Sequence, residues 1–428
     1  MTSAEVGALA CQRDSYRQSI DSTVVEVSAA KDSGNFHVVL SDTVLFPTGG
    51  GQPNDLGTLV LKDVSNPQQT IAVQVLDVQR IGLKCVHVVP RSLEVGQTVV
   101  VVLDWKRRWD HMQQHSGQHL LSAIAETEFN WDTVGWMLGK ERNYVDLSPT
   151  ANHPAPSAQL DMGILLQIEE RVNQVIRQNL SVIVHEDDHD ETKAKPESMP
   201  NDIDRGVVRW VEIGKLDRNP CCGTHVKSTA ELQVLKILSL ERIRGGKHQR
   251  VNFVFGDRVV AALQASLERD RALGPLLNTG PESFVETVTR QSQQLRIVLK
   301  RTKDQTKEIA ELLAFKLTLE LNSSAEPAQV LVHHREDGDA DFASAMVKVV
   351  VERCPQIYCV VTVGSPKEGG MVVIQGPNAV GVDQIVKCFA NACGDSVKGG
   401  GRNDKWQGKA VNWKGLAAAQ AAIQVLHL

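Results

Sequence analysis

Two histidines, His115 and His119, stand four residues apart in the segment HSGQHLL. In a helix, residues four apart lie one turn above one another on the same face, so both imidazoles can reach one metal ion. His111 lies one further turn back on this face, and we expect it to pack against or orient a ligand rather than to bind the metal. The pair alone is weak evidence for a metal site, because core histidines also occur at this spacing.

A second pair of potential ligands, Cys221 and His225, lies in the segment CCGTH about a hundred residues further along. A thiolate and an imidazole four residues apart, beside a glycine, can supply the other half of a zinc site. The two pairs together are much more specific than either one. Cys222 is a competing thiol beside Cys221. We predict one Zn²⁺ ion per chain, bound by His115, His119, Cys221 and His225.

Two other kinds of zinc enzyme are excluded by their motifs. A zinc protease of the HExxH type needs a glutamate directly after the first histidine, but Ser116 follows His115 and Met112 follows His111. A cytidine deaminase needs H-x-E together with P-C-x-x-C. Pro220 does precede a cysteine here, but the second spaced cysteine of that motif is missing.

Composition narrows the class of protein further. With 428 residues we expect two to four domains, and 42% hydrophobic residues exclude wholesale disorder. The net charge of -5 excludes a uniformly basic nucleic-acid binder but allows local basic patches. No run of 18 apolar residues occurs, so we expect no membrane-spanning helix. Eight cysteines in this length do not form a disulfide scaffold, which favours reduced thiols and a cytoplasmic location.

The elements that position these residues differ along the chain. Residues 22–103 consist of β-branched runs broken by turn residues, which favours short strands in a small barrel or sandwich. Inside this region, at residues 46–57, FPTGGGQPNDLG has three consecutive glycines and predicts a loop that other groups approach closely. From Trp105 apolar residues repeat at helical spacing, and mixed helices and strands follow to about Phe255.

The rest of the chain has a different pattern. Residues 256–321 read as helix, interrupted at 278–281 by Asn-Thr-Gly-Pro, and residues 328–428 mix strand-like and helical segments. We therefore expect an α+β multidomain fold. The expected domains are a β-barrel at 1–104, an α/β zinc-containing core at 105–256, a helical linker at 257–325 and a C-terminal α/β glycine-rich domain at 326–428.

The sequence resembles the freestanding alanyl-tRNA editing proteins, the AlaX family, which are related to the editing domain of alanyl-tRNA synthetase. The matching segments are FPTGGGQPNDLG, HSGQHLL, CCGTHV and KHQRVNFVFG, within roughly residues 22–256. The second metal motif of the family, C-x-G-T-H, is intact here. The C-terminal segments GGMVVIQG and KGGGRNDKWQGKA resemble the glycine-rich domain that ends alanyl-tRNA synthetases and long editing proteins.

This resemblance implies a trans-acting deacylase that hydrolyses the ester of alanine tRNA mischarged with serine, or with glycine. The chain begins almost directly with the barrel and has no nucleotide signature such as GxxxxGK[ST], so we expect no aminoacylation activity. Two alternatives stay open: a zinc-stabilised tRNA-binding or assembly factor without catalysis, and a zinc hydrolase of small esters or amides. An open coordination position argues against the first, and a requirement for the tRNA body argues against the second.

The resemblance also suggests residues that contact the amino acid. Thr48 in the glycine loop, and Gln118 and Thr224 between the metal ligands, are candidate catalytic residues. If three ligands bind, the open position holds water or the substrate's amino group, whereas four ligands give a closed site and favour a structural role. A zinc ion here either activates water or orients the ester, and the sequence leaves both open.

Contacts to tRNA are expected at local basic patches because the net charge is negative. One cluster, Lys106, Arg107 and Arg108, precedes the metal-binding helix. The predicted RNA-binding residues are Arg242, Arg244, Lys247, Arg250, Lys398, Arg402, Lys405 and Trp406. A tryptophan among cations suits base stacking beside phosphate contacts. The expected partner is tRNA, with no membrane, and the expected state is a monomer or a homodimer formed through the C-terminal region.

Overall fold

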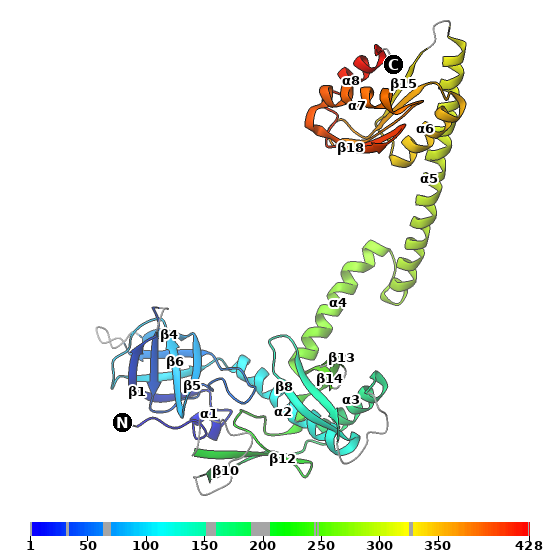
Figure 1. Ribbon diagram of the computed structural model, residues 1–428. Helices are drawn as coiled ribbons and strands as arrows, with labels where there is room; N and C mark the ends of the chain where they lie inside the picture. Colours follow the sequence, from blue (N-terminus) through cyan, green and yellow to red (C-terminus); the bar gives the residue numbers. More distant parts are fainter. Residues whose placement is uncertain are drawn as a thin grey trace. The chain divides into compact units, whose positions relative to one another are not determined.

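The computed structural model describes residues 2–30, 34–62, 70–150, 160–189, 206–243, 245, 248–324, 328–426 and 428. The chain divides into two compact units, Met1–Arg269 and Asp270–Leu428, each with its own sheets and helices (Figure 1). This confirms the α+β multidomain class, while the expected four-domain division remains a prediction. None of the helices in the described ranges is long and apolar enough to cross a membrane.

The first sheet of unit 1 is built from the β-branched runs near the N-terminus. Its seven strands are ordered β4-β3-β7-β1-β2-β6-β5. The two edges of this order, β4 and β5, are separated in the chain by Leu76 alone, so the sheet curls until its edges meet. Strand β7 alternates exposed and buried residues, as expected for one face against a core. The strands are β1 (Ser19–Ala29), β2 (Phe36–Leu40), β3 (Gly57–Lys62), β4 (Thr70–Val75), β5 (Asp77–Ile81), β6 (Lys84–Val89) and β7 (Thr98–Leu103).

Helix α2 (Trp105–Phe129) carries the first pair of predicted ligands. Its N-cap residue is Asp104, whose side chain accepts a hydrogen bond from the Arg107 backbone N–H at 3.2 Å. It ends at Asn130, which adopts the left-handed conformation that commonly terminates helices. Because residues 111–121 of this helix are all buried, its polar side chains there must find partners inside the protein.

Two further sheets and a second helix surround α2 in unit 1. One sheet has the order β13-β14-β9-β8 and the other the order β10-β11-β12. Helix α2 shares one apolar core with helix α3 and these strands. The elements are α1 (Ala10–Arg13), β8 (Trp131–Met137), β9 (Asn143–Pro149), α3 (Met162–Arg177), β10 (Val182–His189), β11 (Gly206–Ile213), β12 (Asp217–Pro220), η1 (Thr229–Leu232), β13 (Leu235–Ile243) and β14 (His248–Phe255).

Helix α4 (Asp257–Leu277) runs from unit 1 into unit 2 and ends at Asn278, where the sequence predicted a break. Helix α5 (Phe284–Ser323) follows the short turn η3 (Pro281–Ser283). The sheet of unit 2 has the order β15-β16-β17-β19-β18, with α5 and α6 packed in one core and α7 and α8 in another. Its elements are β15 (Val330–Arg335), α6 (Ala340–Arg353), β16 (Tyr358–Val363), β17 (Gly370–Gln375), α7 (Ala379–Cys393), η4 (Gly394–Ser396), β18 (Val397–Arg402), β19 (Lys405–Ala410) and α8 (Leu416–Gln424).

Candidate metal centre

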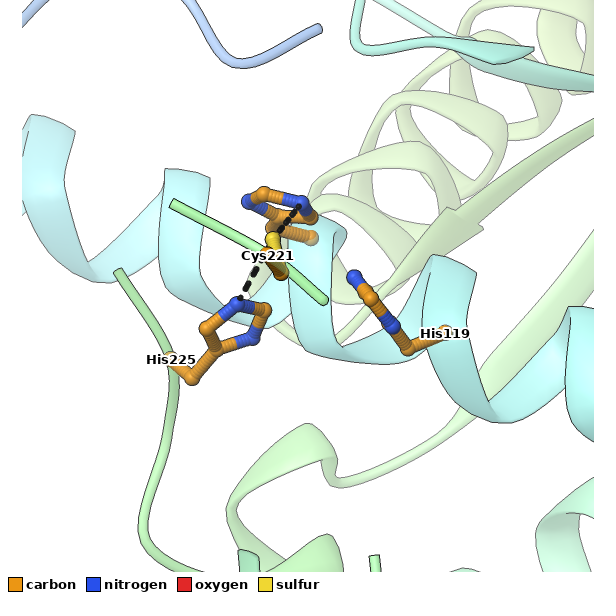
Figure 2. Close-up of side chains that lie close together, drawn as sticks. His119, Cys221 and His225 are labelled. Carbon is orange, nitrogen blue, oxygen red and sulfur yellow. Dashed lines mark hydrogen bonds between the residues drawn. The ribbon is translucent and has the colours of Figure 1, made fainter. Parts of the chain in front are cut away.

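The structure brings the four predicted zinc ligands together inside unit 1. One potential ligand atom from each of them lies within 4.8 Å of the others, and all four side chains are buried. The Cys221 sulfur is 3.3 Å from Nε2 of His115 and 3.3 Å from Nε2 of His225. Figure 2 shows the imidazoles of His119 and His225 turned toward this sulfur. Cys221 and His225 belong to the loop that follows β12, not to a helix.

The donor set fits a zinc ion. Tetrahedral zinc with sulfur and nitrogen ligands places those two atoms about 3.6 Å apart, close to the observed 3.3 Å. Burial lowers the pKa of His119 to about 4, and it lowers the pKa of His115 and His225 well below the ordinary value. The imidazoles are therefore neutral and each offers a lone pair. Burial raises the pKa of the Cys221 thiol to about 12, so zinc must displace its proton. The bound metal remains a prediction.

Gln52, directly after the three glycines of the glycine loop, hydrogen-bonds to both halves of this cluster. Its Oε1 is 2.7 Å from Nδ1 of His115 and accepts the backbone N–H of Thr224 at 3.0 Å. Its Nε2 donates to the Thr224 hydroxyl at 2.9 Å. Because an amide oxygen only accepts, the proton of His115 sits on Nδ1 and leaves the Nε2 lone pair facing Cys221.

Ser116 orients the other histidine that faces Cys221. Its hydroxyl oxygen lies 3.0 Å from Nδ1 of His225 and accepts the backbone N–H of Val226 at 3.1 Å. Since Nε2 of His225 faces the Cys221 sulfur, Nδ1 carries the ring proton and donates it to Ser116. The ligand-bearing helix thus fixes the tautomer of a ligand in the loop.

Arg209 on β11 hydrogen-bonds to the backbone of the loop that carries Cys221 and His225. This side chain is only 1% exposed and donates to the carbonyl oxygens of Cys222, Gly223 and Gln12, each at 2.7 Å. The Gln12 amide donates to the Cys222 carbonyl as well, at 2.9 Å. A Cβ on Gly223 would lie 2.2 Å from Cε1 of His115, so only glycine lets the loop approach that ring.

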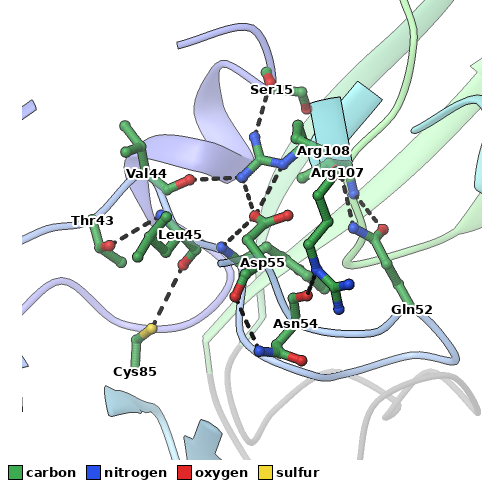
Figure 3. Close-up of polar contacts among 12 residues, drawn as sticks. Ser15, Thr43, Val44, Leu45, Gln52, Asn54, Asp55, Cys85, Arg107 and Arg108 are labelled. Atoms are coloured by element: carbon green, nitrogen blue, oxygen red, sulfur yellow. Dashed lines mark hydrogen bonds and ion pairs between the residues drawn. The ribbon is translucent and has the colours of Figure 1, made fainter. Parts of the chain in front are cut away.

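The base of the glycine loop is fixed to α2 by a buried ion pair (Figure 3). The Asp55 carboxylate accepts the Phe46 backbone N–H at 2.7 Å and Nε of Arg108 at 3.0 Å. Arg108 also donates to the carbonyl oxygens of Ser15 and Val44, at 2.9 and 2.6 Å. Arg108 and Asp55 are fully buried. The expectation that Arg108 belongs to a basic surface is therefore wrong, because an internal carboxylate neutralises it.

A cavity of about 960 Å³ reaches the cluster at His119 and Cys221. The glycine loop, including Thr48, lines its wall, as do Gln118 and Trp136. Gly51 has a φ of 76°, and a Cβ there would lie 2.6 Å from the Trp136 indole, so loop and ring are in close contact.

The three predicted catalytic residues differ in their access to the cavity. Thr48 and Gln118 line the cavity, whereas Thr224 is not among its described lining residues. Thr224 is fully buried, and its hydroxyl accepts from Gln52. Its position favours a supporting role over direct contact, and the catalytic role of all three remains a prediction.

The predicted RNA-binding residues fall in both units. In unit 1, Arg250 forms two hydrogen bonds with Asp146, at 2.8 and 3.0 Å, and its guanidinium lies 3.6 Å from the centre of the Tyr144 ring. Arg242 is exposed on β13, while Arg244 and Lys247 lie outside the described residues. In unit 2 the remaining four lie on the hairpin of β18 and β19. Lys398, Arg402 and Lys405 are exposed, and Trp406 is half-buried.

Sequence reasoning missed three supporting residues: Gln52, Ser116 and Arg209. Gln52 lies in the segment FPTGGGQPNDLG and Ser116 in HSGQHLL, and membership of these motifs was the one feature of the sequence that could have identified them. Nothing in the sequence marked Arg209, since a single arginine in a strand suggests a solvent-exposed side chain.

Comparison with known proteins places the metal loop in a described family. The profile of the threonyl and alanyl tRNA synthetase second additional domain matches residues 208–252, which include Cys221 and His225. The chain is 36% identical to the alanyl-tRNA editing protein Aarsd1 of Mus musculus, over 97% of each protein. It is 31% identical to the putative alanyl-tRNA editing protein alaX of Saccharomyces cerevisiae, over 100% of this chain and 98% of the yeast protein. Alanyl-tRNA editing protein AlaX-L of Pyrococcus horikoshii is 29% identical over 60% of this chain and 59% of its own.

Proposed function

Since the chain belongs to the family of alanyl-tRNA editing proteins, we propose that it is a trans-acting aminoacyl-tRNA deacylase without aminoacylation activity. Its proposed reaction is hydrolysis of the ester between serine and the terminal ribose of mischarged alanine tRNA, with glycyl-tRNA(Ala) as a second substrate. The proposed cofactor is one Zn²⁺ ion, and the proposed location is the cytoplasm.

One observation supports this proposal above the others: the metal cluster opens into the cavity instead of being sealed in the core. His119 and Cys221 line the same cavity as the glycine loop. A purely structural zinc site needs no access to a cavity, whereas a site with three protein ligands and an open position for water or substrate does. Access to a cavity of about 960 Å³ therefore favours a site where a ligand meets the metal.

The protein's own side chains prepare this site. Gln52 and Ser116 each hold a proton on Nδ1 of one histidine, so Nε2 of that histidine is free to bind the metal. A zinc ion held there would supply Lewis acidity, which polarises a carbonyl or activates water. The Asp55–Arg108 pair and the Gln52 amide fix the glycine loop to the metal-binding helix. The loop and the metal ligands thus form one rigid wall around the ester.

The need for such an enzyme follows from the energetics of recognition. A binding pocket for alanine discriminates against glycine or serine by only about 1–3 kcal/mol, because the side chains differ by one small group. A second, hydrolytic site removes the resulting errors.

The direct test is the loss of ester from seryl-tRNA(Ala) and alanyl-tRNA(Ala) incubated with the zinc-loaded protein. We expect rapid loss of serine with alanine spared, and no loss after chelation or in Cys221→Ala. Cys359→Ala, which removes a buried thiol of unit 2, is the matched control and should retain activity. Equal rates on both substrates would refute the proofreading role. Retention of tRNA with no hydrolysis above the spontaneous rate would favour the binding factor.

A further inference from the structure

Two polar atoms of residues that line the cavity have no hydrogen-bond partner among the described residues, Oε1 of Gln118 and Nε of Arg209. Gln118 is only 4% exposed, and its side chain lines the cavity beside His119. Its Oε1 accepts no hydrogen bond from any described residue. A buried acceptor without a donor costs roughly 1–3 kcal/mol, so a ligand that supplies a donor to this oxygen gains that energy.

The direction of this oxygen is set by two hydroxyl groups. Nε2 of Gln118 donates to the Ser122 hydroxyl oxygen at 2.9 Å, and the Thr133 hydroxyl donates to the same oxygen at 2.7 Å. Ser122 lies one turn along α2 from Gln118, and Thr133 lies on β8. Because Ser122 holds the amide nitrogen, the amide oxygen is the buried atom of Gln118 left without a partner among the described residues.

Charged side chains of both signs line this cavity, and Glu126 is the carboxylate among its described lining residues. Glu126, one further turn along α2, is exposed and also lines the cavity. Burial and, after it, the nearby charge of Glu126 raise the pKa of the Asp217 carboxyl, which shows that a second acid lies close by. Two cations also line the cavity: Arg209 donates to three backbone carbonyls through its terminal nitrogens, and Arg80 donates to the Gly82 carbonyl oxygen at 3.1 Å.

An aminoacyl ester carries one charged hydrogen-bond donor that could pair with the Gln118 oxygen. Its α-ammonium is the only cationic donor it has near the ester, and hydrogen bonds from charged donors are roughly twice as strong as neutral ones. The seryl hydroxyl is a neutral donor and is absent from alanine and glycine.

We propose that the Gln118 carbonyl oxygen receives the free α-ammonium of the aminoacyl ester, so that the site acts only on esters whose amino group is unblocked. Ser122 and Thr133 are positioning residues that keep the amide oxygen in the cavity. This inference rests on the proposed function, because it assumes that an aminoacyl ester enters this cavity. It excludes N-acylated esters, including peptidyl-tRNA, from the substrate class.

Binding of two stable probes tests this inference without turnover. The first is 3′-deoxy-3′-(L-serylamino)adenosine, an amide that resists hydrolysis, and the second is its N-acetyl derivative. For the zinc-loaded protein we expect the acetylated probe to bind roughly 10- to 100-fold more weakly, as for the loss of one charged hydrogen bond. Gln118→Met should weaken the seryl probe by a similar factor and abolish the difference, whereas Gln118→Glu should keep it. Ser122→Ala should reduce the difference while zinc affinity stays unchanged.

Gln174→Met is the matched control, since Gln174 is an exposed residue of α3 that does not line the cavity. It should bind both probes like the unaltered protein. Equal binding of both probes by the unaltered protein would overturn the inference and leave the proposed function standing, provided that seryl-tRNA(Ala) is still hydrolysed. A third probe, 3′-deoxy-3′-(L-alanylamino)adenosine, reports on the serine hydroxyl. A Gln118→Met variant that loses only its preference for the seryl over the alanyl probe would also overturn the inference, because Gln118 would then contact the serine hydroxyl. Failure of both probes and of seryl-tRNA(Ala) would refute the function and the inference together.

Discussion

Replacing Gln52 by methionine should weaken zinc binding although Gln52 is not a ligand. The methionine side chain is similar in length but cannot accept the His115 ring proton or hydrogen-bond to Thr224. Without Gln52 the His115 ring is free to exchange tautomers and rotate. Zinc must then order the ring when it binds, which makes the free energy of zinc binding less favourable. Loss of a hydrogen bond that orients a ligand typically lowers metal affinity 10- to 100-fold, or about 1.4–2.7 kcal/mol.

The hydrogen bonds of the Thr224 backbone N–H and hydroxyl to Gln52 contribute to the stability of the fold rather than to zinc affinity. Both Thr224 groups lose a partner whether or not zinc is bound, at about 1–3 kcal/mol each. We therefore expect Gln52→Met to lower the free energy of unfolding of the metal-free protein by about 2–6 kcal/mol, in addition to the effect on zinc.

Competition with a chromophoric chelator measures the zinc affinity, and the visible spectrum of the Co²⁺-substituted protein reports whether the ligand set is intact. Gln52→Glu is the rescue, because a carboxylate still accepts from His115 and from the Thr224 N–H. Gln174→Met is again the matched control on the surface. If Gln52→Met folds and binds zinc within threefold of the unaltered protein, the argument that this amide orients His115 is wrong.

Four further outcomes follow from the structure. Arg108→Met should lower the free energy of unfolding by about 3–5 kcal/mol, because it leaves the Asp55 carboxylate buried without its cation; a loss below 1 kcal/mol in urea unfolding would contradict this. Gly223→Ala should impair zinc binding in the chelator assay, since its Cβ would collide with the His115 ring; unchanged affinity would show that the loop can shift at no cost. Burial lowers the pKa of His87 to about 4 from an unfolded value near 6.5, so stability falls as pH drops from 6.5 to 4, by about 3 kcal/mol in total. His87→Gln should reduce this acid-side loss by about 2.4 kcal/mol when unfolding is compared at pH 7 and pH 4.5, and an unaltered slope would rule out His87 as its source. Removal of zinc by a chelator should lower the unfolding temperature of the protein, which scanning calorimetry measures, because zinc binds the folded state; an unchanged temperature would mean that the cluster holds no metal.

The sequence predicted the metal cluster well because its residue types are rare and its spacings are local. It predicted the grouping of His115 with Cys221 only through the combination of two weak motifs. The residues that orient the ligands were beyond such reasoning. Gln52 contacts partners 63 and 172 positions away, and periodicity carries no information about contacts over that distance. Arg108 shows the opposite error, since its charge suggested a surface and the fold supplied a buried carboxylate.

The helical interruption near residue 278 and the strand-rich N-terminal region could be predicted from turn residues and β-branched runs. A barrel was predicted for residues 1–104, but its strand order was not, because that order depends on β4 and β5 being one nearly continuous segment that pairs at both edges. The position of the metal loop between Arg209 and Gln12 likewise arises from packing among three distant segments.

The contact of Gln12 with the metal loop has a consequence for biosynthesis. Gln12 and Cys222 are 210 positions apart, so the segment that supports the loop leaves the ribosome long before the loop itself. Contacts of such long sequence separation form late in folding. The metal site therefore closes only when nearly the whole of unit 1 has been synthesised, and zinc is acquired by an almost finished chain. Premature termination anywhere before Cys221 yields a product that lacks half of the ligands and cannot trap the ion.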